Sequence, residues 1–276
     1  MAPERTVLVT GCSSGFGLGA ALAFHGRGWK VFAALRDPAR APTELQGIAT
    51  LALDLDDEAQ VIAAADVTPR LDCLVNNAGY ALTGPFSGYG AAQMRRQMQV
   101  NLLGPALLTQ RLLPALRAAR GRVINVSSVA GETGMPMNAL YCSSKYALEG
   151  LSESLRHELA PLGIQVALVE PGAFRTYFAR NSLWGERDLD PAGAEAAQLT
   201  GYRAMRERML AGAGRDPAAV VAAIVRLAEM ENMPLRTRVG GDAFFLRAVK
   251  RLLPEPVALS IVGAAFRRLM ADRAKP

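Results

Sequence analysis

Residues 5–17 read Arg-Thr-Val-Leu-Val-Thr-Gly-Cys-Ser-Ser-Gly-Phe-Gly, and this stretch decides the fold of the chain. The apolar run 5–10 is typical of a buried strand, and an apolar helix is expected from Leu18 to about His25. A glycine-rich turn between a strand and a helix can hold a pyrophosphate. Glycine allows the backbone to approach the ligand, and the free N–H groups of the helix start attract negative charge. A turn without a ligand is the alternative, but three glycines and two small hydroxyl residues exceed what a turn requires.

Strand and helix patterns alternate along the rest of the chain. Further strands are expected at residues 30–35, 50–53, 71–75, 122–126 and 164–169, with one long helix over 91–120 and another that contains Tyr141. Repeated strand-then-helix units predict an α/β fold with a doubly wound parallel sheet, that is, a Rossmann fold in three α/β/α layers. Half of the 276 residues are hydrophobic, and no repeat or linker divides them, so we expect a single domain over 1–276.

Small and polar residues follow four of the expected strands. They are found at Gly11–Gly17, Asn76–Gly79, Ser127–Ser128 and Pro171–Gly172. In doubly wound sheets the ligand binds beyond the carboxyl ends of the strands. We therefore expect these four segments to line one edge of the sheet.

A tyrosine and a lysine four residues apart, Tyr141 and Lys145, suggest acid–base chemistry. On a helix these positions share one face, so the phenol and the ammonium can meet. A free tyrosine has a pKa of about 10 and is a poor proton shuttle at neutral pH, but a nearby cation favours the phenolate and lowers that pKa. Such a phenol is a usable general acid/base. The spacing alone is more often found on an ordinary helix surface, so its weight comes from the motifs upstream.

Together these motifs resemble those of the classical short-chain dehydrogenase/reductase family. The matches occur in the order of the family and cover about residues 5–180: Thr10-Gly11-x-x-x-Gly15-x-Gly17, Asn76-Asn77-Ala78-Gly79, Asn101, Ser128, Tyr141-x-x-x-Lys145 and Pro171-Gly172. Within the family the chain looks most like the branch with hydroxysteroid and retinol dehydrogenases, because of residues 10–15 and 141–145.

The resemblance implies a catalytic role for four residues. Tyr141 would exchange a proton with the substrate oxygen, Ser128 would hold that oxygen, and Lys145 would lower the Tyr141 pKa and bind the nicotinamide ribose. Asn101 would hold a water that links Lys145 to solvent, which fits a site in a long helix because a polar group there can interrupt the backbone ladder. Ser127 is the alternative to Ser128, but the family places this serine thirteen residues before the tyrosine, where Ser128 stands.

The resemblance also implies the cofactor contacts. Asn77, Ala78 and Gly79 would line the adenosine ribose, and Asp54 would meet the adenine, although capping of the next helix is an equal alternative for Asp54. The full set of implied cofactor residues is Gly11, Ser13, Ser14, Gly15, Phe16, Gly17, Arg36, Asp54, Leu55, Asn77, Ala78, Gly79, Tyr141, Lys145, Pro171, Gly172 and Thr176.

The end of the second strand bears on the choice of nicotinamide. An acid there binds the ribose 2′-hydroxyl of NAD, whereas an arginine accommodates the 2′-phosphate of NADP. The chain has Ala34 and Leu35 where relatives that use NAD carry the acid, and Arg36 follows at once. Its guanidinium can grip a phosphate bidentately. NADP is therefore the expected cofactor. NAD remains the alternative, because Asp37 adjoins Arg36 and could restrain its side chain.

These inferences predict an NADP(H)-dependent oxidoreductase. It would interconvert an alcohol and a ketone or aldehyde on an apolar, steroid- or retinoid-like substrate, held by Ser128, Tyr141, Met135, Phe178 and Trp184. Residues 175–215 would form the substrate-loop region, and ordinary core packing is the alternative for the aromatics. The alternatives in function are an inactive nucleotide-binding sensor, an NAD-dependent dehydrogenase of the same family, and a sugar-nucleotide epimerase.

Charge and cysteine content exclude other classes. Residues 240–276 carry seven basic residues against three acids and predict a basic, apolar helical extension that packs on the domain or on a second subunit. Peripheral membrane contact is a less favoured alternative, and no basic stripe with stacking aromatics supports nucleic-acid binding.

Three scattered cysteines and two histidines predict no metal site and a reducing cytoplasm. We expect no signal peptide, because the first strand begins so early, and a homo-oligomer, either a dimer or a tetramer.

Overall fold

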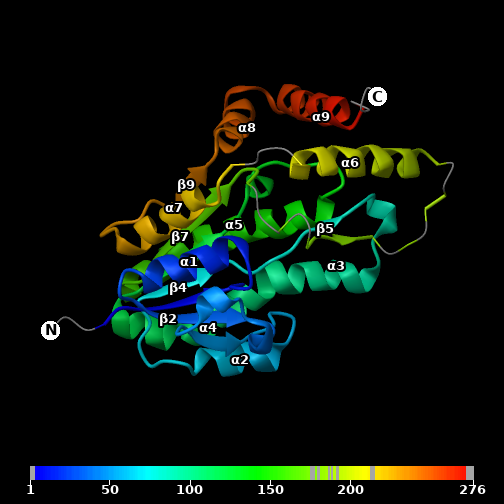
Figure 1. The fold of residues 1–276 in the computed structure, drawn as a ribbon. Coiled ribbons are helices and arrows are strands. Elements are labelled where there is room, and N and C mark those ends of the chain that lie inside the picture. The colour runs from blue at the N-terminus through cyan, green and yellow to red at the C-terminus, as the bar shows by residue number, and fades with distance from the viewer. Residues whose placement is uncertain are drawn as a thin grey trace.

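The computed structural model describes residues 4–174, 178, 181–185, 187, 189–190, 193–211 and 215–271 of the chain. Within these residues one parallel sheet has the strand order β3-β2-β1-β4-β6-β7-β9, with helices on both faces (Figure 1). Its strands are β1 (Thr6–Thr10), β2 (Lys30–Leu35), β3 (Ala49–Ala52), β4 (Cys73–Asn76), β6 (Arg122–Val126), β7 (Gln165–Pro171) and β9 (Arg236–Val239). The predicted doubly wound Rossmann topology is confirmed.

Strand alternation divides the core into two layers. In β1, Val7 and Val9 point to one face and pack under α1 (Gly15–His25) and α7 (Ala218–Glu229). Leu8 points to the other face, against α2 (Glu58–Ala65), α4 (Gly104–Ala119) and α5 (Ala139–Leu159). Because successive side chains of a strand point to opposite faces, a continuous apolar run such as β1 is buried on both sides.

The long helix predicted over 91–120 is interrupted. It consists of α3 (Ala91–Met98), a π-helical turn at Gln99–Leu103 and then α4. Asn101 lies inside this turn, so the interruption that the sequence predicted at this residue is present. Single π-helical turns inside α-helices are often found at functional sites.

The remaining elements lie beside and above the sheet. They are β5 (Leu82–Thr83), β8 (Leu183–Trp184), α6 (Ala194–Ala211), α8 (Gly241–Leu252) and α9 (Glu255–Ala271). Figure 1 shows α8 and α9 at the top of the molecule, outside the α/β layers, with α9 beside α6. Among the described residues, no helix is both long and apolar enough to cross a bilayer.

Candidate active site

A cleft of about 460 Å³ opens at the carboxyl ends of the central strands. All four segments that we expected along one edge of the sheet contribute to it. Its walls include Thr10, Gly11, Ser13, Ser14, Gly15, Phe16, Leu35, Arg36, Leu53, Asp54, Leu55, Asn77, Ala78, Gly79, Ser127, Ser128, Tyr141, Lys145, Pro171 and Gly172. The sheet therefore brings together residues that are 162 positions apart in sequence, Thr10 and Gly172.

The glycine loop leaves no room for side chains. Gly11 has φ +75°, and a Cβ there would lie 2.9 Å from the Cα of Ala78. A Cβ on Gly17 would lie 2.3 Å from the carbonyl oxygen of Gly11. Both positions require glycine, because any side chain would collide with backbone that the fold cannot move. The loop thus keeps its backbone exposed toward the cleft.

The start of α1 suits an anionic ligand. Ser14 is the N-cap residue of α1, yet its side chain makes no capping hydrogen bond, and the first turn carries no acidic residue. The first N–H groups of a helix lack partners within the helix and favour negative charge. The residues of this loop therefore fit a pyrophosphate, as a dinucleotide cofactor would supply.

Thr10 and Asn77 join the loops after β1 and β4. The Thr10 hydroxyl accepts hydrogen bonds from the backbone N–H groups of Asn77 and Ala78, both at 3.0 Å. In return, Asn77 Nδ2 donates to the carbonyl oxygen of Thr10 at 2.8 Å. We did not assign Thr10 a separate site role from the sequence; its place as the last residue of the first strand was the available signal. Asn76 instead lies behind the cleft, where its amide donates to Asn125 Oδ1 at 2.8 Å.

Arg36 and Asp37, which the sequence left as opposing indications of NADP and NAD, differ in their contacts. The Asp37 carboxylate accepts from Ala39 N at 3.1 Å and pairs with Arg40 at 3.3 Å. It therefore caps the short helical turn that follows. Arg36 is exposed at the cleft and has no hydrogen bond or ion pair within the described chain.

Asp54 lines the cleft but does not cap α2. Its carboxylate accepts from the N–H of Asp56 at 3.1 Å, and the cap of α2 is Asp57, which accepts from Ala59 and Gln60. The capping alternative for Asp54 is therefore wrong. The adjacent Leu55 is buried below the same wall.

Tyr141 and Lys145 are both buried on the face of α5 that borders the cleft. Lys145 Nζ donates to the carbonyl oxygen of Val126 at 2.8 Å and lies 6.0 Å from the centre of the Tyr141 ring. Burial lowers the pKa of Lys145 to about 8, while the Glu149 carboxylate opposes this shift. Helix spacing thus brings the two side chains together at the end of β6.

The Tyr141 phenol is more strongly protonated than the sequence suggested. Burial raises its pKa to about 12, although a hydrogen bond with Ser128 acts in the opposite direction. The lowering of this pKa that the sequence predicted from Lys145 is therefore wrong in direction, because burial of the phenol disfavours its charged form. The Phe178 ring packs 5.5 Å from the phenol ring. At neutral pH Tyr141 holds its proton and is ready to donate it.

Ser128 and Ser127 are distinguished by their partners. Ser128 begins the short helical turn after β6, where its oxygen accepts from Ala130 N at 3.2 Å, and it also bonds to the Tyr141 phenol. The Ser127 hydroxyl is buried without a hydrogen-bond partner among the described residues. Of the two serines, Ser128 is therefore the one that contacts the Tyr141 phenol.

Asn101 connects the loop after β4 to the Tyr141 helix. Its Oδ1 accepts from Tyr80 N at 3.1 Å, while its Nδ2 donates to Tyr80 O at 2.9 Å and to Ser144 Oγ at 3.1 Å. Ser144 in turn donates to the carbonyl oxygen of Tyr141 at 2.7 Å. Both amide protons are used, so the side chain can hold a water only through the remaining lone pair of Oδ1.

The residues expected to hold the substrate separate into two groups. Phe178 lines the cleft, and Met135 packs on the cluster that contains Tyr141. Trp184 is not among the described residues that line the cleft; its ring packs 6.3 Å from that of Tyr202 and beneath the guanidinium of Arg203. Thr176 lies outside the described residues.

Several cleft residues had no site role assigned from the sequence, and three of them are polar or charged residues in loops and helices. They are Tyr80, Arg96 and Asn181. Tyr80 directly follows Asn77-Ala78-Gly79, so its position was the available signal. Arg96 pairs with Asp56 at 3.0 Å, a contact between α3 and the loop after β3 that cannot be predicted from either segment alone.

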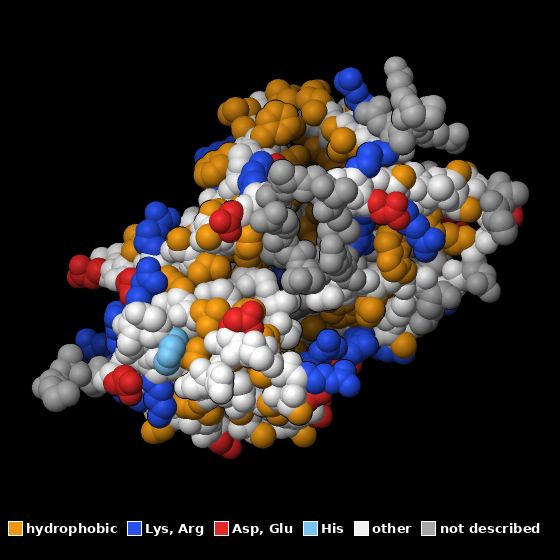
Figure 2. Space-filling view, viewed as in Figure 1, with side chains coloured by type: hydrophobic (Ala, Val, Ile, Leu, Met, Phe, Trp, Pro, Cys, Tyr) orange, Lys and Arg blue, Asp and Glu red, His pale blue; other side chains and the backbone are white. Residues whose placement is uncertain are grey.

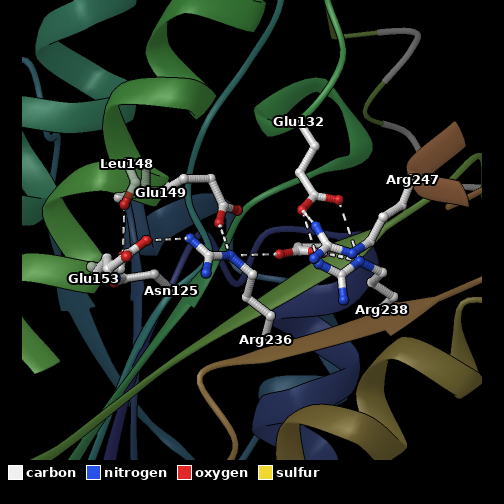
Figure 3. Close-up of polar contacts among 10 residues, drawn as sticks. Asn125, Glu132, Leu148, Glu149, Glu153, Arg236, Arg238 and Arg247 are labelled. Atoms are coloured by element: carbon white, nitrogen blue, oxygen red, sulfur yellow. Dashed lines mark hydrogen bonds and ion pairs between the residues drawn. The ribbon is translucent and has the colours of Figure 1, made fainter. Parts of the chain in front are cut away.

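A charged cluster joins β9 and α8 to α5 and to the segment after Ser128 (Figure 3). Arg236 pairs with Glu149 and Glu153 at 2.9 Å each. Arg238 pairs with Glu132 at 2.8 Å and with Glu170 at 3.0 Å. Burial and the neighbouring carboxylates of Glu149 and Glu132 raise the pKa of Glu170 to about 8. The cluster fixes the segment after Ser128, which contains Glu132, against the last strand of the sheet.

Known proteins are similar to this chain in sequence. The family model described as short chain dehydrogenase matches residues 5–186. The 17-beta-hydroxysteroid dehydrogenase type 1 of Homo sapiens is 34% identical over 287 residues, which cover 98% of this chain and 87% of that protein.

Two solved structures have a similar fold. A short-chain dehydrogenase from Streptomyces avermitilis gives a TM-score of 0.78 with 31% sequence identity, covering 98% of this chain and 96% of that chain. A metagenomic short-chain oxidoreductase in complex with NADP gives a TM-score of 0.66 with 26% identity, covering 85% of this chain and 96% of that chain.

Proposed function

Since the chain belongs to the short-chain dehydrogenase family and is an NAD(P)-dependent oxidoreductase, we propose that it reduces an apolar ketone or aldehyde with NADPH and catalyses the reverse oxidation. The observation that carries this proposal is the contact between the Tyr141 phenol and Ser128, with the buried Lys145 ammonium beside them and the glycine loop opposite. A proton donor, a donor for the developing oxyanion and a phosphate cradle share one cleft.

The residues of the cleft have distinct tasks in this reaction. A bound nicotinamide supplies or accepts the hydride. Tyr141 gives its proton to the carbonyl oxygen during reduction, while the Ser128 hydroxyl holds that oxygen and stabilises its developing charge. Lys145 holds the ribose and favours the phenolate when Tyr141 has lost its proton.

The raised Tyr141 pKa gives the two directions opposite pH dependence. Reduction needs the phenol protonated, which a pKa of about 12 ensures at neutral pH. Oxidation needs the phenolate, whose fraction grows about tenfold with each pH unit below the pKa. Near neutral pH the rate of reduction should therefore change little with pH, whereas the rate of oxidation should increase as the pH rises.

Arg36 supports NADP as the cofactor. It lies at the end of β2, is exposed at the cleft and has no described partner, while Asp37 is committed to its own turn and to Arg40. A guanidinium so placed can bind a 2′-phosphate. The metagenomic relative of similar fold was solved with NADP.

Replacing Arg36 by alanine should weaken NADP binding much more than NAD binding. A hydrogen-bonded charge pair with a phosphate contributes roughly 1.5–3 kcal/mol, which is about ten- to a hundredfold in Kd. Titration of both dinucleotides by fluorescence measures the two changes. Arg40→Ala is the matched control, because Arg40 is an exposed arginine of the same loop and is not among the cleft residues. An equal loss for NAD and NADP would show that Arg36 does not read the 2′-phosphate.

The apolar cleft wall supports a bulky hydrophobic substrate. Phe174, Phe178 and Leu183 line the cleft, and the Phe178 ring packs on that of Tyr141. Met135 adds an adaptable side chain to the cluster around that tyrosine. The relative from Homo sapiens is named as a hydroxysteroid dehydrogenase. We propose a fused-ring or long-chain alcohol/carbonyl pair, of steroid- or retinoid-like size.

A panel of carbonyl compounds with NADPH tests this function. Bulky apolar ketones should be consumed with higher kcat/KM than small polar ones, followed by the loss of reduced nicotinamide absorbance. Phe178→Ala should raise the KM for bulky ketones about tenfold, since it removes an aromatic contact of roughly 1.4 kcal/mol, and should spare NADPH binding. Phe86→Ala, an exposed phenylalanine away from the cleft, is the control.

The result that would contradict the substrate class is a preference for small polar carbonyls. A Phe178→Ala variant that lowers only thermal stability would likewise contradict it. No turnover with any carbonyl or alcohol, together with tight NADPH binding, would favour the nucleotide-binding sensor instead.

A further inference from the structure

The last two helices expose an apolar surface that the rest of the molecule does not cover. We call it the C-terminal patch, and its main residues are Phe244, Phe245, Leu252, Leu253, Val257 and Ile261. Phe244 and Phe245 are 59% and 61% exposed, and Leu252 is 78% exposed. Figure 2 shows hydrophobic side chains gathered at the top of the molecule, over α8 and the start of α9.

Neither helix needs this surface for its own packing. α8 buries Ala243 and Val249 on its inner side, while α9 buries Ala258 and Val262 and places Phe266 against the cluster of α6. An ordinary surface helix has one apolar face toward the core and a polar face toward solvent. Here the solvent side is apolar as well, and every residue from 250 to 257 is exposed at the corner between the helices.

Basic side chains border the C-terminal patch. Arg251, Arg267 and Arg268 are exposed and form no ion pair with any described residue. The acid Asp242 at the start of α8 is committed, because it pairs with Arg215 and accepts from Ala173 N at 2.6 Å. Glu255 is exposed between Leu253 and Val257, within the patch in sequence. Three exposed arginines against this one acid leave the patch and its border with a net positive charge.

The combination of charge and apolar exposure selects the partner. A second copy of the same patch would bring these arginines against each other, which is unfavourable. A bilayer with anionic headgroups accepts apolar side chains at the acyl boundary and attracts cations at its surface. We propose that the C-terminal patch attaches the protein to an anionic lipid surface without crossing it.

This attachment would place the cleft close to the membrane. Asp242 contacts Ala173, directly after the Pro171–Gly172 wall of the cleft, and Phe244 follows Asp242 by two residues. Apolar molecules dissolved in the bilayer would thus reach the cleft over a short path. Membrane attachment itself does not depend on the proposed catalysis and is measured without it.

Vesicle sedimentation tests the proposal with the full chain. The protein should sediment with vesicles that contain phosphatidylserine and not with vesicles of phosphatidylcholine alone. Binding should weaken in about 1 M salt, where the Debye length is about 3 Å. Phe244→Ser with Phe245→Ser should reduce binding at least about tenfold, because two aromatic anchors are lost. Reversing Arg251, Arg267 and Arg268 to glutamate should reduce it about a hundredfold or more.

Matched controls separate the patch from general effects. Phe86→Ser and the pair Arg111→Glu with Arg117→Glu alter exposed residues of the same types elsewhere and should leave binding unchanged. Equal binding to neutral and anionic vesicles, or unchanged binding of both patch variants, would overturn the proposal. So would absence of vesicle binding together with an oligomer that dissociates in the Phe244/Phe245 variant, which would make the patch a subunit interface. If the phenylalanine variant unfolds, the arginine variant, which changes only exposed side chains, decides.

Discussion

Tyr141→Phe is expected to lower kcat for carbonyl reduction by about 10²–10⁴-fold, the usual contribution of a positioned general acid. The change removes the phenol oxygen, which is the proton donor in the proposed reaction and contacts Ser128. The ring itself stays, so its packing against Phe178 and Met135 persists. NADPH affinity should therefore remain near that of the unmodified protein. Steady-state reduction of a bulky ketone and a separate NADPH titration measure the two effects.

Tyr146→Phe is the matched control for this experiment. Tyr146 lies on the same helix, is 41% exposed and bonds through its hydroxyl to Lys250, outside the cleft. Its removal should leave kcat unchanged. If the Tyr141 variant instead keeps most of its kcat, another group supplies the proton and the acid/base assignment is wrong.

Lys145→Met should impair cofactor binding and oxidation together. Loss of a charge-assisted hydrogen bond to the ribose should weaken NADPH binding about ten- to a hundredfold. Loss of the cation should also raise the Tyr141 pKa further, because a nearby positive charge stabilises the phenolate. Oxidation requires that phenolate, so its rate at a given pH should fall and its pH profile should shift to higher pH. Alcohol oxidation measured across a pH series, with NADP titrations, shows both changes.

Methionine keeps the apolar stem of Lys145 while it removes the buried charge, so the fold should be retained, as thermal unfolding can check. Lys30→Met, at the exposed start of β2, is the control and should change neither affinity nor pH profile. An unchanged NADPH affinity with an unshifted profile in the Lys145 variant would remove Lys145 from the mechanism.

Much of the fold was predictable because its strands carry their own signals. The strands predicted at 30–35 and 122–126 have these same bounds in the structure. The glycine loop was predictable as well, because its backbone geometry requires glycine at Gly11 and Gly17, and these glycines are visible in the sequence. Such features depend on local steric preferences of residue types, which can be read from a short stretch of sequence.

The features that were missed depend on contacts between distant segments. β9 was not predicted, because Arg236 and Arg238 make its sequence too polar to resemble a buried strand. These arginines pair with Glu149 of α5 and Glu170 of β7. Glu170, an acid inside a buried apolar strand, was the available signal that a cation would have to meet it. The direction of the Tyr141 pKa and the displacement of Trp184 from the cleft likewise follow from packing that no single segment encodes.

The position of β9 at the end of the sheet has a consequence for where this polypeptide can be cut. The family match stops at residue 186, yet the sheet is completed only by residues 236–239, fifty positions later. A fragment ending at 186 would expose the backbone of β7 as an unprotected edge strand. It would also lack Arg236 and Arg238, which pair with Glu170. Unpaired, apolar edge strands pair with other chains and aggregate, so we expect a fragment that covers only the family match to aggregate.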